Sequence, residues 1–223
     1  MRRRRLKSRF SISTREVEND VSHKSGYQAG YDLGFRFGKE DSQRSFDGTS
    51  IIVLAHSPNE SIIDTIQKIE ALTPHPYELL VADAGSSETT RQYIIQRTGI
   101  VRHILARNDE GIISVLNKAA LVANGKKIIL LAGGSPNKDN WIEDLMVELD
   151  SEASINAIYA NTTWMKDINS RLHACCLLFR TELLADIGLW SEDVPTLKEC
   201  LSEWLARIPQ ENRIIMEDFD SIS

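Results

Sequence analysis

Three short apolar runs, separated by stretches of helical periodicity, constrain what this chain can fold into. They are TSIIVLA at 49–55, LLVA at 79–82 and KKIILL at 126–131. Each run is continuous rather than alternating and is rich in leucine, isoleucine and valine, which is typical of parallel strands buried on both faces. Segment 62–72, between the first two runs, carries its isoleucines at helical spacing. We therefore expect an α/β fold, Rossmann-like, with a mainly parallel sheet flanked by helices.

The same alternation continues along the rest of the chain. Further strands are expected at 100–105, 155–162 and 173–180, and further helices at 89–97, 111–123, 140–149, 182–187 and 194–208. The end of the chain, 213–223, has the pattern of a strand or a tail. Parallel strands joined through helices form right-handed units, so their carboxyl ends are expected to meet at one edge of the sheet.

One acid stands at the end of the second apolar run. Asp83 closes this run and is followed by Ala84, Gly85 and two serines that lead into the next helix. In open α/β sheets, ligands bind at the carboxyl edge of the strands, where helix N-termini present free N–H groups. Ser86 and Ser87 are interpreted as helix caps rather than nucleophiles, because no G-x-S-x-G context surrounds them. We therefore expect the binding site beside Asp83.

Charge is unevenly distributed between the start of the chain and its body. The net charge of −6 over 223 residues includes six basic residues at positions 2–9, so of 26 basic residues 20 remain against 32 acidic ones. A body without a basic face argues against nucleic acid as a partner. No apolar run reaches the ~18 to 20 residues of a membrane helix, and the start lacks the apolar core of a signal peptide. The sequence predicts a cytoplasmic protein without a transmembrane segment.

The three cysteines give no sign of a metal site or a disulfide framework. Cys175, Cys176 and Cys200 are odd in number and lack the CxxC spacing. We expect buried structural thiols at all three positions.

Glycine recurs every four residues from Gly26 to Gly38, and an aromatic residue follows three of these glycines. On a helix this spacing forms a stripe of small residues beside an aromatic stripe. Each glycine costs a helix about 0.8–1 kcal/mol relative to alanine, so such a helix needs close packing. We expect either self-association through residues 24–40 or an arm folded on its own domain. The expected domains are 1–47, a basic tip with a helical arm, and 48–223, the α/β domain.

The ordered succession of the α/β segments resembles family 2 glycosyltransferases, which have the GT-A fold. The resemblance covers Ser50 to Arg207 and rests on TSIIVLAHSPNESIIDTIQKI, PYELLVADAGSSETT, ARNDEGIISVLNKAALVANGKKIILLAGG and CCLLFRTELLADIGLWSED. It implies a GT-A domain that binds a nucleotide-sugar, namely a UDP- or dTDP-sugar. It also implies transfer of the sugar to an acceptor, which the sequence does not define.

Carried over residue by residue, the resemblance implies a nucleotide-sugar site and a catalytic base. Asp83 matches the acid that hydrogen-bonds the uracil or ribose, and Asn117 matches an Asn that shapes the pocket. A carboxylate can accept from base N–H groups or ribose hydroxyls. The implied binding residues are Ala55, His56, Asp83, Gly85, Asn108, Gly111, Asn117, Gly133 and Gly134. The family's base is an Asp or Glu near the start of a late helix, and the candidates here are Glu192, Asp193 and Glu203.

The chain departs from the family at the metal motif. The family has Asp-x-Asp after the fourth core strand, which holds a divalent cation at the diphosphate. Here the corresponding residues are Ala132-Gly133-Gly134, and the next carboxylate is that of Asp139. A divalent cation is thus a cofactor whose usual ligands are missing. An alternative source of positive charge is one of the residues Arg107, Lys126, Lys127 and Lys138.

Three functions remain open after this departure. The first is glycosyl transfer with altered or absent metal dependence. The second is a non-catalytic GT-A pseudo-enzyme that acts as a binding or assembly module. The third is a different α/β nucleotide-binding protein whose basic tip touches nucleic acid.

Overall fold

The computed structural model describes residues 46–58, 61–74, 76–97, 99–107, 110–161 and 175–216. These residues belong to one compact unit of the chain, Arg44–Ser223. The basic tip and the glycine-rich segment 24–40 lie outside the described residues, as does the predicted binding residue Asn108. The predicted division into 1–47 and 48–223 stays a prediction.

A seven-stranded sheet forms the centre of this unit, with the strand order β3-β2-β1-β4-β6-β5-β7. The strands are β1 (Phe46–Ala55), β2 (Tyr77–Asp83), β3 (Val101–Leu105), β4 (Gly125–Ala132), β5 (Ala157–Asn161), β6 (Cys175–Arg180) and β7 (Arg213–Met216). β1 pairs in parallel with β2 and β4, and β2 pairs in parallel with β3. β6 is antiparallel to both β4 and β5, whereas β7 is parallel to β5. The described sheet is therefore mainly parallel, with β6 running against its neighbours.

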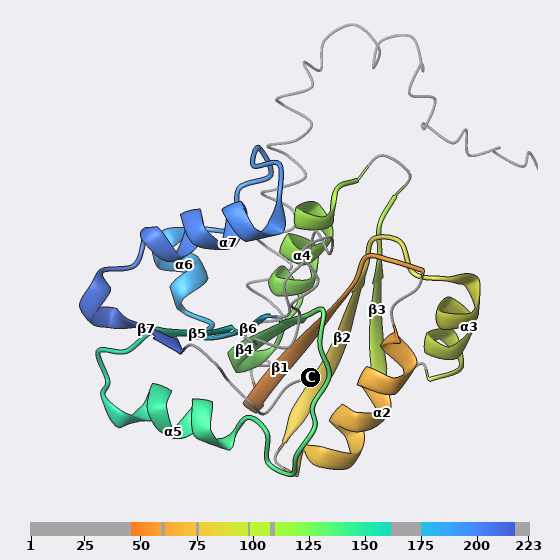
Figure 1. Cartoon of the computed structure of the whole chain (residues 1–223), viewed down its shortest axis with the longest axis horizontal. Coiled ribbons are helices and arrows are strands. Elements are labelled where there is room, and N and C mark those ends of the chain that lie inside the picture. The colour runs from red at the N-terminus through yellow and green to blue at the C-terminus, as the bar shows by residue number, and fades with distance from the viewer. Residues whose placement is uncertain are drawn as a thin grey trace, which may run out of the picture. The chain divides into compact units, whose positions relative to one another are not determined.

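Helices cover both faces of the sheet (Figure 1). They are α2 (Ile62–Leu72), α3 (Glu88–Gln96), α4 (Ile112–Leu121), α5 (Glu143–Ser151), α6 (Leu183–Ile187) and α7 (Leu197–Ala206), with a short 3₁₀-helix, η2 (Gln210–Asn212). Alternate residues of β1 face opposite cores: Ile51 belongs to the core that also contains residues of α2, α3 and α5, and Ile52 to the core that contains residues of α4, α6 and α7. This arrangement confirms the predicted α/β fold and explains why its strands are apolar on both faces.

The predicted helix cap Ser87 and the predicted buried cysteines are found in the structure. The Ser87 hydroxyl caps α3 by accepting from the N–H of Thr90 at 3.2 Å. The three cysteines are buried free thiols, and burial raises the pKa of Cys175 to about 12. Within the described residues, no helix has both the length and the apolar character required to cross a membrane.

Candidate functional site

The carboxyl ends of β1, β2 and β3 lie side by side, and their pairing continues one residue beyond the sheet. The N–H of Ala84 donates to the carbonyl of Ala55 at 2.7 Å, and the N–H of Ala106 donates to the carbonyl of Asp83 at 2.8 Å. A Cβ atom at Gly85 would lie only 2.9 Å from the carbonyl oxygen of His56. The two loops are therefore in close contact, and a side chain at position 85 has no room.

Asp83 is fully buried at this edge, and its carboxylate is surrounded by donors from its own chain. Oδ1 accepts from the backbone N–H groups of Gly85 at 3.1 Å and Ser86 at 2.8 Å. Oδ2 accepts from the Ser86 hydroxyl at 2.7 Å and from Arg91 Nε at 3.3 Å. His103 Nε2 lies 2.9 Å from the same oxygen. The carboxylate thus joins the turn after β2 to β3 and α3.

This network keeps Asp83 ionised. Burial alone would raise the pKa of Asp83, but the hydrogen bonds from His103, Ser86 and Gly85 outweigh burial and hold the pKa well below its usual range. A ligand could reach this carboxylate only by displacing one of its present donors. The geometry therefore gives Asp83 the task of holding the 84–86 turn in place beside His56.

A second group of predicted residues meets between α4 and the loop that follows α6. Asn117, in the second turn of α4, donates from Nδ2 to the carbonyl of Trp190 at 2.9 Å and to Glu192 Oε1 at 3.1 Å. Its Oδ1 accepts from the N–H of Trp190 at 3.1 Å. The structure thus brings together Asn117 and Glu192, which were predicted separately as a binding residue and a catalytic residue. Asp193 follows in the same exposed loop.

The third predicted acid, Glu203, has a different environment. Its carboxylate forms a two-pronged pair with Arg207, with Nε–Oε1 at 2.8 Å and Nη2–Oε2 at 2.6 Å. The hydrogen bond from Arg207 lowers the pKa of Glu203. Arg207 Nη1 in turn donates to the carbonyls of Ile187 at 3.0 Å and Leu189 at 2.8 Å. Glu203 therefore orients the arginine that anchors the start of the loop leading to Glu192.

The loop after β4 leaves the carboxyl edge and runs along α2. Gly133 begins it with a φ of 70°, a left-handed conformation that favours glycine. Ser135 then accepts from Lys68 Nζ at 3.0 Å. Further along, the N–H of Asn140 donates to the carbonyl of Leu72, the last residue of α2, at 3.1 Å.

This path decides where Asp139 lies. Trp141 is fully buried, and its Nε1 donates to Thr73 Oγ1 at 2.8 Å, just before β2 begins. Asp139 is therefore fixed near the amino edge of the sheet, at the opposite end of α2 from the site beside Asp83. Within the part of the chain that is described, no group of three or more His, Cys, Asp or Glu side chains could hold a metal ion.

The four cationic residues proposed as substitutes for a metal are also separated by the fold. Lys126 and Lys127 begin β4 and lie at the amino edge. Lys138 lies on the loop after β4 and pairs with Asp144 at 3.2 Å. Of the four, Arg107 follows β3 at the carboxyl edge, next to Ala106.

The predicted binding residue Gly111 is the N-cap residue of α4, with open space around the position of a Cβ atom.

The strand order and the helices on both faces form the GT-A fold, which solved glycosyltransferase structures share. A sequence model described as glycosyl transferase family 2 matches residues 50–187, and the chain belongs to this family. A search of curated proteins finds no match.

Solved structures with the same fold have low sequence identity to this chain. The mannosyltransferase PcManGT from Pyrobaculum calidifontis, solved with GDP-Man and Mn²⁺, has a TM-score of 0.60 and 15% identity over 85% of this chain and 63% of its own. S. aureus TarS 1-349 has a TM-score of 0.59 and 16% identity over 78% of this chain and 58% of its own. Glucosyl-3-phosphoglycerate synthase from Mycobacterium tuberculosis, solved with Mn²⁺, UDP and phosphoglyceric acid, has a TM-score of 0.61 and 13% identity over 83% of this chain and 73% of its own. The chain spans about three fifths of the length of the first two, at 63% and 58%.

Proposed function

We propose that this chain binds a nucleotide-sugar at the carboxyl edge of β1–β3 and transfers the sugar to an acceptor, with altered or absent metal dependence. The observation that carries the proposal is the contact of Gly85 with the His56 carbonyl, 2.9 Å from an added Cβ. This contact, together with the Asp83 network, gives a rigid backbone edge that a planar base or a ribose can approach. Family membership and two neighbours solved with GDP-Man or UDP support the same ligand class.

Glu192 is the proposed general base. As the acceptor hydroxyl attacks the anomeric carbon of the sugar, the bond from that carbon to the diphosphate breaks, and Glu192 takes the hydroxyl proton. The hydrogen bond from Asn117 Nδ2 at 3.1 Å orients the carboxylate. Asp193, exposed in the same loop, is the alternative base.

The residues after β4 do not fit a divalent cation in the family's usual position. Ala132, Gly133 and Gly134 offer no carboxylate, and Asp139 lies near the other edge of the sheet. We infer that Arg107 supplies positive charge to the diphosphate instead, since a guanidinium forms paired charge-assisted hydrogen bonds with phosphate oxygens. The altered or absent metal dependence of the proposed reaction therefore depends on Arg107 taking the place of the cation.

Calorimetry with UDP, in the presence and absence of Mn²⁺, tests the proposal. We expect UDP to bind with an affinity that Mn²⁺ leaves unchanged, and Arg107→Gln to weaken binding about tenfold or more. Arg102→Gln is the matched control, because Arg102 lies at the amino end of the same strand. Absence of UDP binding under both conditions would contradict the proposal.

A non-catalytic binding module is the second candidate, favoured by the missing carboxylates after β4. Donor hydrolysis and transfer assays separate the two functions. An active enzyme should lose turnover in Glu192→Gln and keep its affinity for UDP. Metal-independent UDP binding without any turnover in the unmodified chain would favour the binding module.

Three expectations from the sequence remain as proposals. These are a cytoplasmic location, a UDP- or dTDP-sugar as the donor, and self-association through residues 24–40. Comparison of the oligomeric state with and without residues 1–47 by light scattering tests the last of these, and an unchanged state would remove it.

A further inference from the structure

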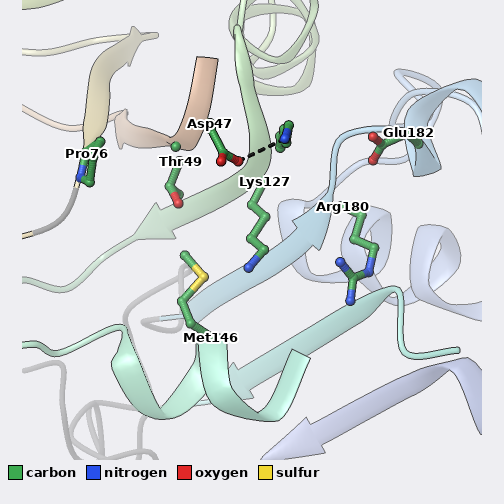
Figure 2. Close-up of a pocket in the computed structure, with 9 residues that line it drawn as sticks. Asp47, Thr49, Pro76, Lys127, Met146, Arg180 and Glu182 are labelled. Carbon is green, nitrogen blue, oxygen red and sulfur yellow. Dashed lines mark ion pairs between the residues drawn. The ribbon is translucent and has the colours of Figure 1, made fainter. Parts of the chain in front are cut away.

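A cavity of about 340 Å³ lies at the amino edge of the parallel strands, at the end of the sheet opposite the proposed donor site (Figure 2). Its wall comes from the start of β1 and β4, the residue before β2, helix α5, and the end of β6. The volume lies within the range of small-molecule sites. The proposed glycosyl transfer makes no use of this cavity.

Two cations face each other across the strands that form one wall. Lys127 of β4 is the register partner of Arg180 of β6, so both side chains project from the same face of the sheet. Figure 2 shows both side chains extending in the direction of α5, where Met146 reaches toward them. Like charges placed directly opposite on antiparallel strands repel each other. An anion beside the two groups relieves this repulsion.

The anion is at present a carboxylate of the chain itself. Asp150 of α5 accepts from Lys127 Nζ at 2.5 Å and from Arg180 Nη2 at 3.3 Å. Arg180 also donates from Nε and Nη2 to the carbonyls of Ile155 at 3.1 Å and Leu149 at 2.8 Å. These bonds hold the guanidinium in a fixed orientation before any ligand arrives.

Asp150 is the most exposed member of this charge cluster. Its side chain is 50% exposed, whereas those of Lys127 and Arg180 are 21% and 28% exposed. Solvated ion pairs contribute little to stability, so an incoming anion can replace Asp150 at small cost. The other cation of the cavity, Lys126, pairs with Asp47 at 2.9 Å, and the Asp47 side chain is 90% exposed. Glu182, also in the lining, limits the number of negative charges that the cavity accepts.

We propose that this cavity is a second ligand site, for a small anion with a phosphate or carboxylate head group. Lys127 and Arg180 hold the head group in place of Asp150, and Met146 and Pro76 contact the short apolar body. The site is separate from the donor site, because it lies at the amino ends of the strands whose carboxyl ends form the donor edge.

Calorimetry of the full chain at low ionic strength tests the site, with inorganic phosphate and acetate as separate probes. Binding should be in the millimolar range and weaken at least tenfold in Lys127→Gln. Met146→Glu keeps both cations but places a carboxylate in the cavity, and it should abolish binding. Lys198→Gln, an exposed lysine of α7, is the control for net charge and should leave the affinity unchanged. The stronger of the two probes identifies the head group.

Three results would overturn the site. The first is that neither phosphate nor acetate gives a measurable heat of binding. The second is equal affinity in the unmodified chain and in Lys127→Gln. The third is a loss of binding in Arg107→Gln but not in Lys127→Gln, which would place the anion at the donor edge. Circular dichroism of each variant confirms that the fold is retained.

Discussion

Replacement of Asp83 by asparagine tests the structural task of its carboxylate. The Asn side chain keeps the shape but has one oxygen, which the backbone N–H groups of Gly85 and Ser86 require. Its NH₂ group then faces the Ser86 hydroxyl, Arg91 and His103, three groups that now contact Oδ2. Breaking a buried, hydrogen-bonded charge network costs about 3–5 kcal/mol. Urea unfolding should show this loss, and thermal scanning should show a Tm about 10 °C lower.

Asp64→Asn is the matched control, because it makes the same chemical change in a solvated ion pair. Asp64 lies 2.9 Å from Lys68, its side chain is 47% exposed, and the pair contributes less than about 1 kcal/mol. Equal losses in the two variants would refute the structural task of Asp83. Unchanged stability with weakened UDP binding would instead return Asp83 to the role of a direct ligand contact, as first expected from the family resemblance.

Other predictions follow from the same structure. Because the folded pKa of Asp83 is lowered, its stabilisation is fully present above the unfolded pKa and is lost as the pH falls through the folded pKa; the difference in unfolding free energy between the wild-type chain and Asp83→Asn should therefore shrink below about pH 4. Gly125→Ala should destabilise the chain by about 1–3 kcal/mol in urea unfolding, since the new Cβ would lie 2.6 Å from the N of Ser50, whereas Gly111→Ala meets no atom within 4 Å and should be near neutral. Cys175, whose pKa burial raises to about 12, should react with a thiol reagent only after unfolding, as measured by absorbance with and without denaturant.

Much of the fold could be predicted because each buried strand is a continuous apolar run with a polar, helix-starting segment behind it. Residues 49–55 and 126–131 form strands as expected, although β1 begins earlier, at Phe46, and their direct pairing was not predicted. The direction of β6 could not be predicted. A strand buried on both faces has the same apolar sequence whether it runs parallel or antiparallel to its neighbour, and the position of β6 beside β4 depends on long-range pairing.

The candidate site was only partly predictable, because strand ends are local and side-chain partners are not. Ala55, Asp83 and Gly85 were expected at one edge, since parallel strands end on the same side, and they lie there. The contact of His103 with Asp83 could not be predicted, because His103 reaches the carboxylate from the next strand. The bond from Asn117 to Glu192 joins residues 75 positions apart. Only the packed loop after α6 brings those two side chains within hydrogen-bonding distance.

The path of the loop after β4 decides whether another acid can replace the missing Asp-x-Asp motif. From sequence alone, Asp139 was too distant to replace the absent acids unless its loop folded back to the carboxyl edge. The buried indole of Trp141, bonded to Thr73 at 2.8 Å, fixes the loop at the other end of α2 and excludes that path in this fold. Any replacement for the diphosphate's cation must then come from another element at the carboxyl edge. Of the four cationic residues considered, Arg107 meets this condition, so its substitution is the decisive experiment for metal-independent transfer.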